Sequence, residues 1–207
     1  MSRGCPVCRL FVLLIAFSAV SSALAQKLEC GVTNVTDSWI TVDLANTYNS
    51  AVVVCTPVNN ENDTEAVTRV RNVDADSFEL RLQNPIVGSS VASRTVYYLV
   101  VEEGLWEVDD LVIEAQRVSS TYTHAHDDGN GNWDPANGVD YDALFLTNYT
   151  APVVIGQVMT ENDSDWSVFW ACGTDRENPP TSSDCMVGKH VGKDSDITRA
   201  DETLGVI

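Results

Sequence analysis

The chain has 207 residues, enough for one large domain or two small ones, and its formal charge is −18 at pH 7. An acidic excess of this size argues against nucleic acid as a partner, because the phosphates would be repelled, and against anionic membrane surfaces. It is compatible with calcium binding.

The first 25 residues have the three-part pattern of a secretory signal peptide. Arg3 and Arg9 give a basic start, residues 10–17 form an apolar core, and Ala23 and Ala25 form an A-x-A cleavage site. The alternative, an uncleaved membrane anchor, would need an apolar run of about 20 residues. We therefore expect residues 1–25 to be removed, leaving a secreted, extracellular chain with no membrane span.

Four cysteines remain after export, and an even set in an exported chain favours disulfides over metal ligands or catalytic thiols. They are Cys30, Cys55, Cys172 and Cys185. Of the possible pairings we prefer the local one, Cys30–Cys55 and Cys172–Cys185. Asn-x-Ser/Thr sequons also predict glycosylation at the surface positions Asn34, Asn62, Asn148 and Asn162.

Short β-strand patterns follow one another between residues 38 and 118. The strand patterns are Trp39–Leu44, Ala51–Cys55, the hairpin Thr68–Leu82 and Thr95–Val101. Within the hairpin, Phe78, Leu80 and Leu82 alternate with polar residues, as in a half-buried strand. No segment has convincing helical periodicity. The pattern predicts an all-β fold, an antiparallel β-sandwich.

Residues 119–141 are rich in Gly, Asn and Asp, which predicts a linker. Alternating oxygen ligands at Asp128, Asn130, Asn132 and Asp134 suit calcium, although Trp133 replaces the glycine of the helix-loop-helix calcium motif. His124, His126 and Asp128 could instead bind zinc or a related ion. For both sets the simpler interpretation is a solvated acidic loop.

The second half of the chain echoes the first. Asn148–Ile155 is similar to Thr47–Val54, and Glu202–Ile207 is similar to Arg94–Leu99. In the first copy the last strand continues through Val100–Gly104, whereas in the second it stops. We expect two related β-units, residues 26–118 and 142–207, the second incomplete at its C-terminus. Either the chain is a fragment or the missing strand comes from a partner.

The first unit resembles the H-type lectin domain and related extracellular repeat modules. The matching residues are Trp39, Tyr48, Ala51–Val54, Val70–Val73, Ser77–Leu80 and Thr95–Gly104. The resemblance covers residues 38–104 and, more faintly, 145–207. It implies a six-stranded antiparallel β-sandwich, often assembled as trimers whose subunit edges bind N-acetylgalactosamine-like sugars. It also nominates Arg71 and Tyr98 as ligand-binding residues.

The sequence contains no Gly-x-Ser-x-Gly elbow, P-loop or dinucleotide fingerprint. We therefore expect a secreted carbohydrate-binding, lectin-like protein without enzymatic activity, with cell-surface or matrix glycans as partners and a homo-oligomer as a possible assembly. The alternatives are a non-enzymatic structural or adhesive protein of the extracellular matrix, and a metal-dependent hydrolase centred on His124 and His126.

Overall fold

The computed structural model describes residues 27–125 and 145–207, except residues 62, 87–88, 109 and 176. All regular structure in these residues is β-strand, and almost all strand pairs are antiparallel. The predicted all-β, antiparallel, sandwich-like fold class is therefore confirmed. In the described part of the chain, no helix is long and apolar enough to span a membrane.

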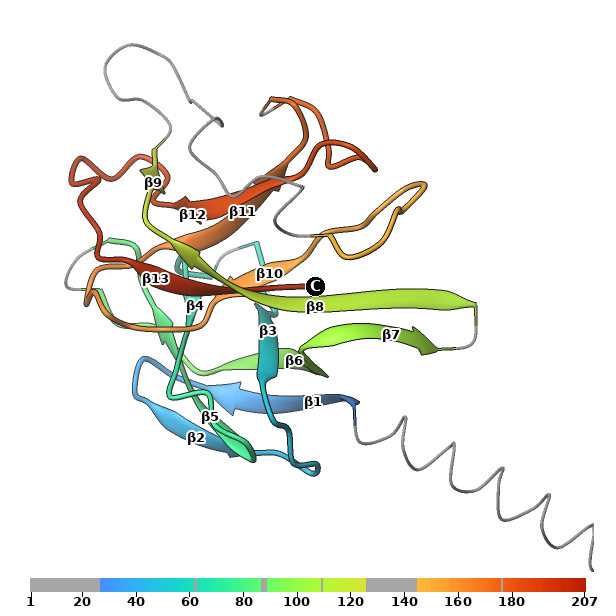
Figure 1. The fold of residues 1–207 in the computed structure, drawn as a ribbon. Helices are drawn as coiled ribbons and strands as arrows, with labels where there is room; N and C mark the ends of the chain where they lie inside the picture. Colours follow the sequence, from blue (N-terminus) through green and yellow to red (C-terminus); the bar gives the residue numbers. More distant parts are fainter. Residues whose placement is uncertain (1–26, 62, 87–88, 109, 126–144, 176) are drawn as a thin grey trace, which may run out of the picture.

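The first half forms two three-stranded sheets (Figure 1). The strands are β1 (Leu28–Val35), β2 (Ile40–Asp43), β3 (Ala51–Pro57), β4 (Val67–Arg71), β5 (Ser77–Gln83) and β6 (Arg94–Glu102). One sheet has the order β1-β6-β3 and the other β2-β5-β4. Phe78, Leu80 and Leu82 are fully buried in the core together with Val96 and Val100 of β6. The alternation predicted for the hairpin is therefore present, and it directs one face of β5 into the core.

The second half repeats this strand order. Its strands are β7 (Gly104–Val108), β8 (Leu111–Ser120), β9 (Thr123–His124), β10 (Gly156–Val158), β11 (Val168–Cys172), β12 (Met186–His190) and β13 (Glu202–Val206). The order β8-β13-β10 corresponds to β1-β6-β3, and β9-β12-β11 corresponds to β2-β5-β4. The pairings differ at β9, which runs parallel to β12 whereas β2 runs antiparallel to β5. This correspondence supports two related units, which stay a prediction.

Three elements lie where the sequence did not place them. β8 pairs with β13, so residues 111–120 belong to a sheet of the second half, although the sequence assigned residues up to 118 to the first unit and 119–120 to the linker. β9 lies within the predicted linker, residues 119–141, and pairs with β12. β1 occupies a stretch without a clear apolar pattern. At its middle, Gly31 faces Tyr98 of β6, and a Cβ on Gly31 would lie 2.2 Å from the Tyr98 Oη atom. β1 contributes Val35 and Leu28 to the core, and at Gly31 the space is filled by a ring from β6, which no local pattern reveals.

The two halves pack closely where β3 lies against β8, β10 and β13 (Figure 1). Gly205 of β13 lies close to β3, since a Cβ there would be 2.9 Å from the Val52 Cγ1 atom of the first half and 2.5 Å from the Met159 Sδ atom of its own half. Met159 and Ala115 of the second half belong to the same buried cluster as Val52. The halves therefore share part of one core.

Candidate functional site

The two residues nominated for ligand binding are both engaged within the fold. Arg71 contacts Glu79 through Nε at 2.5 Å and Glu161 through Nη1 at 2.8 Å, and its guanidinium lies 4.0 Å from the centre of the Trp39 ring. Tyr98 packs edge-on against Phe78, and burial raises the pKa of the Tyr98 hydroxyl. The structure describes no contact between Arg71 and Tyr98. Their role in ligand binding stays a prediction.

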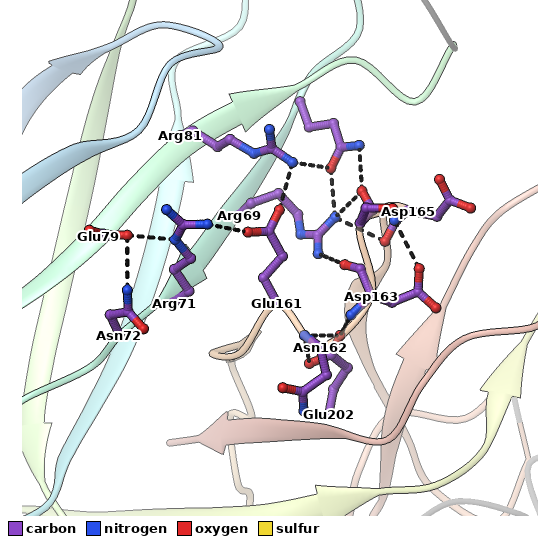
Figure 2. Close-up of polar contacts among 12 residues, drawn as sticks. Arg69, Arg71, Asn72, Glu79, Arg81, Glu161, Asn162, Asp163, Asp165 and Glu202 are labelled. Carbon is purple, nitrogen blue, oxygen red and sulfur yellow. Dashed lines mark hydrogen bonds and ion pairs between the residues drawn. The ribbon is translucent and has the colours of Figure 1, made fainter.

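Arginines of the β4–β5 hairpin bind the loop at residues 161–165 of the second half (Figure 2). Glu161 lies between Arg71 and Arg81, whose Nη2 atom is 2.7 Å from the Glu161 carboxylate. Arg69 is only 1% exposed and donates to the backbone carbonyls of Asp163 and Asp165 at 2.8 and 2.9 Å. Burial lowers the pKa of Arg69, and the charge of Glu161 opposes that shift. The arginines belong to the first half and the groups that they bind belong to the second half, so the network joins the two halves.

The predicted disulfides are absent, and all four cysteines are free thiols. Cys30 pairs with Leu99 and Cys55 with Tyr98, on opposite sides of β6. Two strand spacings separate their Cα atoms by about 10 Å, beyond the limit of about 7 Å for a disulfide. Leu99 and Tyr98 are successive residues, so their partners also point to opposite faces of the sheet. The pairing Cys30–Cys55 is therefore wrong.

Cys172 and Cys185 are both buried at the end of the β11–β12 pair. Cys172 lies opposite Met186, so Cys185 is its diagonal neighbour and not its direct partner. The Cys172 thiol donates to the Gly173 carbonyl at 3.3 Å. Burial raises the pKa of Cys172 to about 11 and that of Cys185 to about 12, and the nearby Cys172 adds to the second shift.

The candidate metal ligands lie mostly outside the described residues. This holds for Asp128, Asn130, Asn132 and Asp134, and for His126. His124 is buried on β9, with its ring edge-on to Trp170 at 4.7 Å. Among the residues that the structure describes, no group of three or more His, Cys, Asp or Glu side chains could hold a metal ion. The calcium and zinc sites stay predictions.

Asn34, Asn148 and Asn162 are exposed, as glycosylation requires, and Asn62 lies outside the described residues. Asn162 uses its Nδ2 atom to donate to the Asp201 carbonyl at 2.7 Å. Occupancy of the sequons stays a prediction.

An open, largely apolar groove lies beside β8, with a volume of about 570 Å³. One wall is residues 111–116 of β8, the other is residues 148–155, and Leu99, Val206 and Ile207 close the space between them. We call this the β8 groove. Four apolar side chains at its walls are exposed: Leu111 at 61%, Val112 at 41%, Val153 at 84% and Ile155 at 40%.

One buried carboxylate lies within the β8 groove. Glu114 accepts hydrogen bonds from the Leu146 N–H at 2.8 Å and from the Tyr149 hydroxyl at 3.0 Å. The first half has the same arrangement, since Glu29 accepts from the Ala45 N–H at 3.1 Å and from the Tyr48 hydroxyl at 3.3 Å. Glu29 thus holds residues 45–48, which precede β3, and Glu114 holds residues 146–149, which precede β10. Glu114 therefore shapes one wall of the groove.

Comparisons with family models, with curated proteins and with solved structures found no match for this chain. The resemblance to H-type lectins, and with it carbohydrate binding, stays a prediction.

The β8 groove is the feature that sequence reasoning came nearest to finding. The signal was the similarity of Asn148–Ile155 and Glu202–Ile207 to Thr47–Val54 and Arg94–Leu99, because residues of both later segments line the groove. What the sequence could not provide was the location of the space, because that depends on the pairing of β8 with β13.

Proposed function

We propose that this chain is a non-enzymatic structural or adhesive protein of the extracellular space, which acts by binding another macromolecule in the β8 groove. The observation that carries this proposal is the open apolar groove with Leu111, Val153 and Ile155 exposed at its walls. Contiguous exposed apolar surface of this kind marks interaction sites in soluble proteins.

The composition of the groove favours a protein ligand over a sugar. Sugar recognition depends on several convergent hydrogen-bonding groups, whereas Glu114 and Tyr149 in this groove are already bonded to each other. The remaining walls are mainly aliphatic. A hydrophobic segment of another protein matches this lining better than a pyranose does.

A solid-phase assay on immobilised extracellular matrix extract tests the proposal. We expect the secreted chain to bind, and Val153→Asp to weaken binding at least tenfold, because a carboxylate would have to enter an apolar interface. Ile86→Asp is the matched control, since Ile86 is 59% exposed but outside the groove. Equal binding by Val153→Asp, or loss of binding with N-acetylgalactosamine in excess, would contradict the proposal.

A further inference from the structure

The outer face of the sheet β1-β6-β3 carries exposed apolar side chains. Val96 of β6 is fully buried in the core, and side chains of a strand alternate between its two faces, so Tyr97 points outward. Tyr97 is 58% exposed, Val32 of β1 is 57% exposed and Val58, just after β3, is 41% exposed. We call these three residues the outer patch. Exposed apolar surface of this kind is a candidate for a covering contact.

The strand register brings two side chains of the outer patch together. Val32 lies directly opposite Tyr97. The Lys27 carbonyl accepts from the Glu102 N–H at 2.9 Å, and hydrogen-bonded pairs alternate with non-hydrogen-bonded pairs along an antiparallel ladder. Val32 and Tyr97 therefore form a non-hydrogen-bonded pair, in which the two side chains lie closest to each other.

The sequon residue Asn34 lies at the border of the outer patch. Asn34 is exposed and opposite Thr95, whose carbonyl accepts from the Val58 N–H at 2.8 Å. These three residues form a row across the sheet, next to the row of Val32 and Tyr97. Diagonal neighbours in an antiparallel pair are about 7–8 Å apart, which is within reach of an aromatic ring. A group attached to Asn34 would therefore meet the Tyr97 ring.

The Asn34 amide is held in an orientation that suits glycosylation. Its Oδ1 atom accepts a hydrogen bond from the Thr95 hydroxyl at 3.2 Å. Among the residues that the structure describes, none forms a hydrogen bond with its Nδ2 atom. Asn162 differs, because its Nδ2 atom donates to the Asp201 carbonyl at 2.7 Å. The atom that carries an N-linked glycan is thus free at Asn34 and engaged at Asn162.

From this placement we infer that Asn34 carries an N-linked glycan whose first N-acetylglucosamine packs on the outer patch, with the apolar C–H face of the sugar against the Tyr97 ring. An aromatic ring offers a large apolar surface for such a contact. The occupant is specified by its attachment at the border of the patch. This inference rests on the extracellular location stated in the proposed function, and it adds a modification that covers one face of the first half.

The modification is a group transfer from a lipid-linked oligosaccharide diphosphate. A bond forms between the Asn34 Nδ2 atom and C1 of N-acetylglucosamine, and the bond from C1 to the diphosphate oxygen breaks. One Nδ2 proton is released to solvent, and the lipid diphosphate is the leaving group. The Oδ1 atom is unchanged, so the hydrogen bond from Thr95 is compatible with the glycan.

A mutant cycle on the chain secreted from eukaryotic cells tests the contact. Glycopeptide mass spectrometry should find Asn34 occupied. Asn34→Gln should lower the thermal midpoint by about 2–4 °C, because it uncovers the outer patch. In a Tyr97→Thr background the same change should lower it much less. Tyr122→Thr is the matched control, since Tyr122 is 55% exposed but outside the patch, and the full shift should remain there.

Two further measurements address the first sugar. Enzymatic trimming of the glycan to a single N-acetylglucosamine should preserve most of the shift in midpoint, because that sugar makes the contact. Nuclear Overhauser contacts should join its protons to the ring protons of Tyr97. An unoccupied Asn34, equal shifts in the wild-type and Tyr97→Thr backgrounds, or loss of the whole shift on trimming would overturn the inference.

The outcomes separate the inference from the proposed function. If Val153→Asp weakens matrix binding but Asn34 is unoccupied, the glycan contact fails and the adhesive function stands. If the cycle shows coupling but matrix binding is indifferent to Val153→Asp, the glycan contact stands and the adhesive function fails. A chain that is retained inside the cell would overturn both. A dimer of the glycosylated chain that Tyr97→Thr dissociates would assign the outer patch to a second copy and overturn the glycan contact.

Discussion

For single residues, position in the strand ladder decides what a side chain can do. Cys30 is exposed on the edge strand β1, whereas Cys55 is buried on β3, and burial raises the pKa of the Cys55 thiol. Cys172, with a pKa raised to about 11, is about one part in a thousand thiolate at pH 8. Since the thiolate is the reactive form, these cysteines should differ widely in reactivity.

We therefore predict that iodoacetamide at pH 8 labels Cys30 in the native chain, and labels Cys55, Cys172 and Cys185 only after unfolding. Peptide mass spectrometry with and without guanidinium measures this, and Cys30→Ser is the control that should remove native labelling. A Cys30–Cys55 cross-linked peptide in a non-reduced digest would show that the strand register of β1, β6 and β3 is wrong.

Residue patterns predicted those features that depend on near neighbours. Phe78, Leu80 and Leu82 are buried as their alternation indicated, because alternation is a local property of a strand. The arginines of the same hairpin could not be interpreted from the sequence. Arg69 is buried by carbonyl groups of Asp163 and Asp165, which are far along the chain. Long-range partners of this kind leave no periodic pattern.

For the secondary-structure elements, β13 makes a close contact with β3 of the other half at Gly205. A side chain on Gly205 would meet the Met159 and Val52 side chains at distances that real Cβ atoms do not adopt. Met159 can move, but Val52 is fully buried and held in its strand. Glycine at position 205 is thus a packing requirement of the contact between the two halves.

We predict that Gly205→Val destabilises the chain by about 1–3 kcal/mol, the usual cost of overpacking a core, despite the higher strand propensity of valine. Urea unfolding followed by tryptophan fluorescence measures the change. Thr203→Val, on the same strand, is the control for strand propensity and should cost less than Gly205→Val. An unchanged midpoint for Gly205→Val would mean that β3 does not pack on β13.

The pairing of whole strands explains why the sequence did not locate the β8 groove. The repeated strand pattern at residues 148–155 and 202–207 identifies residues that line the groove, but not the groove itself. The walls of the groove depend on β8, which pairs with β13 across most of the second half. Sheet order is set by non-local pairing, and sequence periodicity does not encode it.

For the whole molecule, buried carboxylates make the free energy of unfolding depend on pH at acidic pH. Burial opposes ionisation of Glu102, but the N–H groups of Asn49 and Ser50, together with Lys27, more than offset it, so the pKa of Glu102 lies below its usual value. For Asp163 burial is likewise outweighed, by hydrogen bonds from Asp165 and Ala200, and its pKa is lowered. Each half of the molecule therefore contains a carboxylate that favours the folded state when ionised.

The sign of the effect follows from linkage. A carboxylate whose pKa is lower in the folded state stabilises the fold fully above its unfolded value of about 4.3 for Glu, and the contribution is lost as the pH falls through the folded value. We predict that Glu102→Gln costs about 2 kcal/mol at pH 7 and much less at pH 3. Urea midpoints of both proteins across this range measure it. A pH-independent difference would mean that Glu102 acts through its shape and not its charge.

The strand order of the two halves has a consequence for the kinetics of folding. The central strand of each sheet, β6 or β13, comes after both of its neighbours in the chain. During synthesis, β1 and β3 cannot form their sheet until β6 is made, and β8 and β10 wait in the same way for β13. Assembly dominated by such distant contacts is slow, and unpaired edges are open to wrong partners in the meantime. This chain should therefore refold slowly and depend on dilution for its yield.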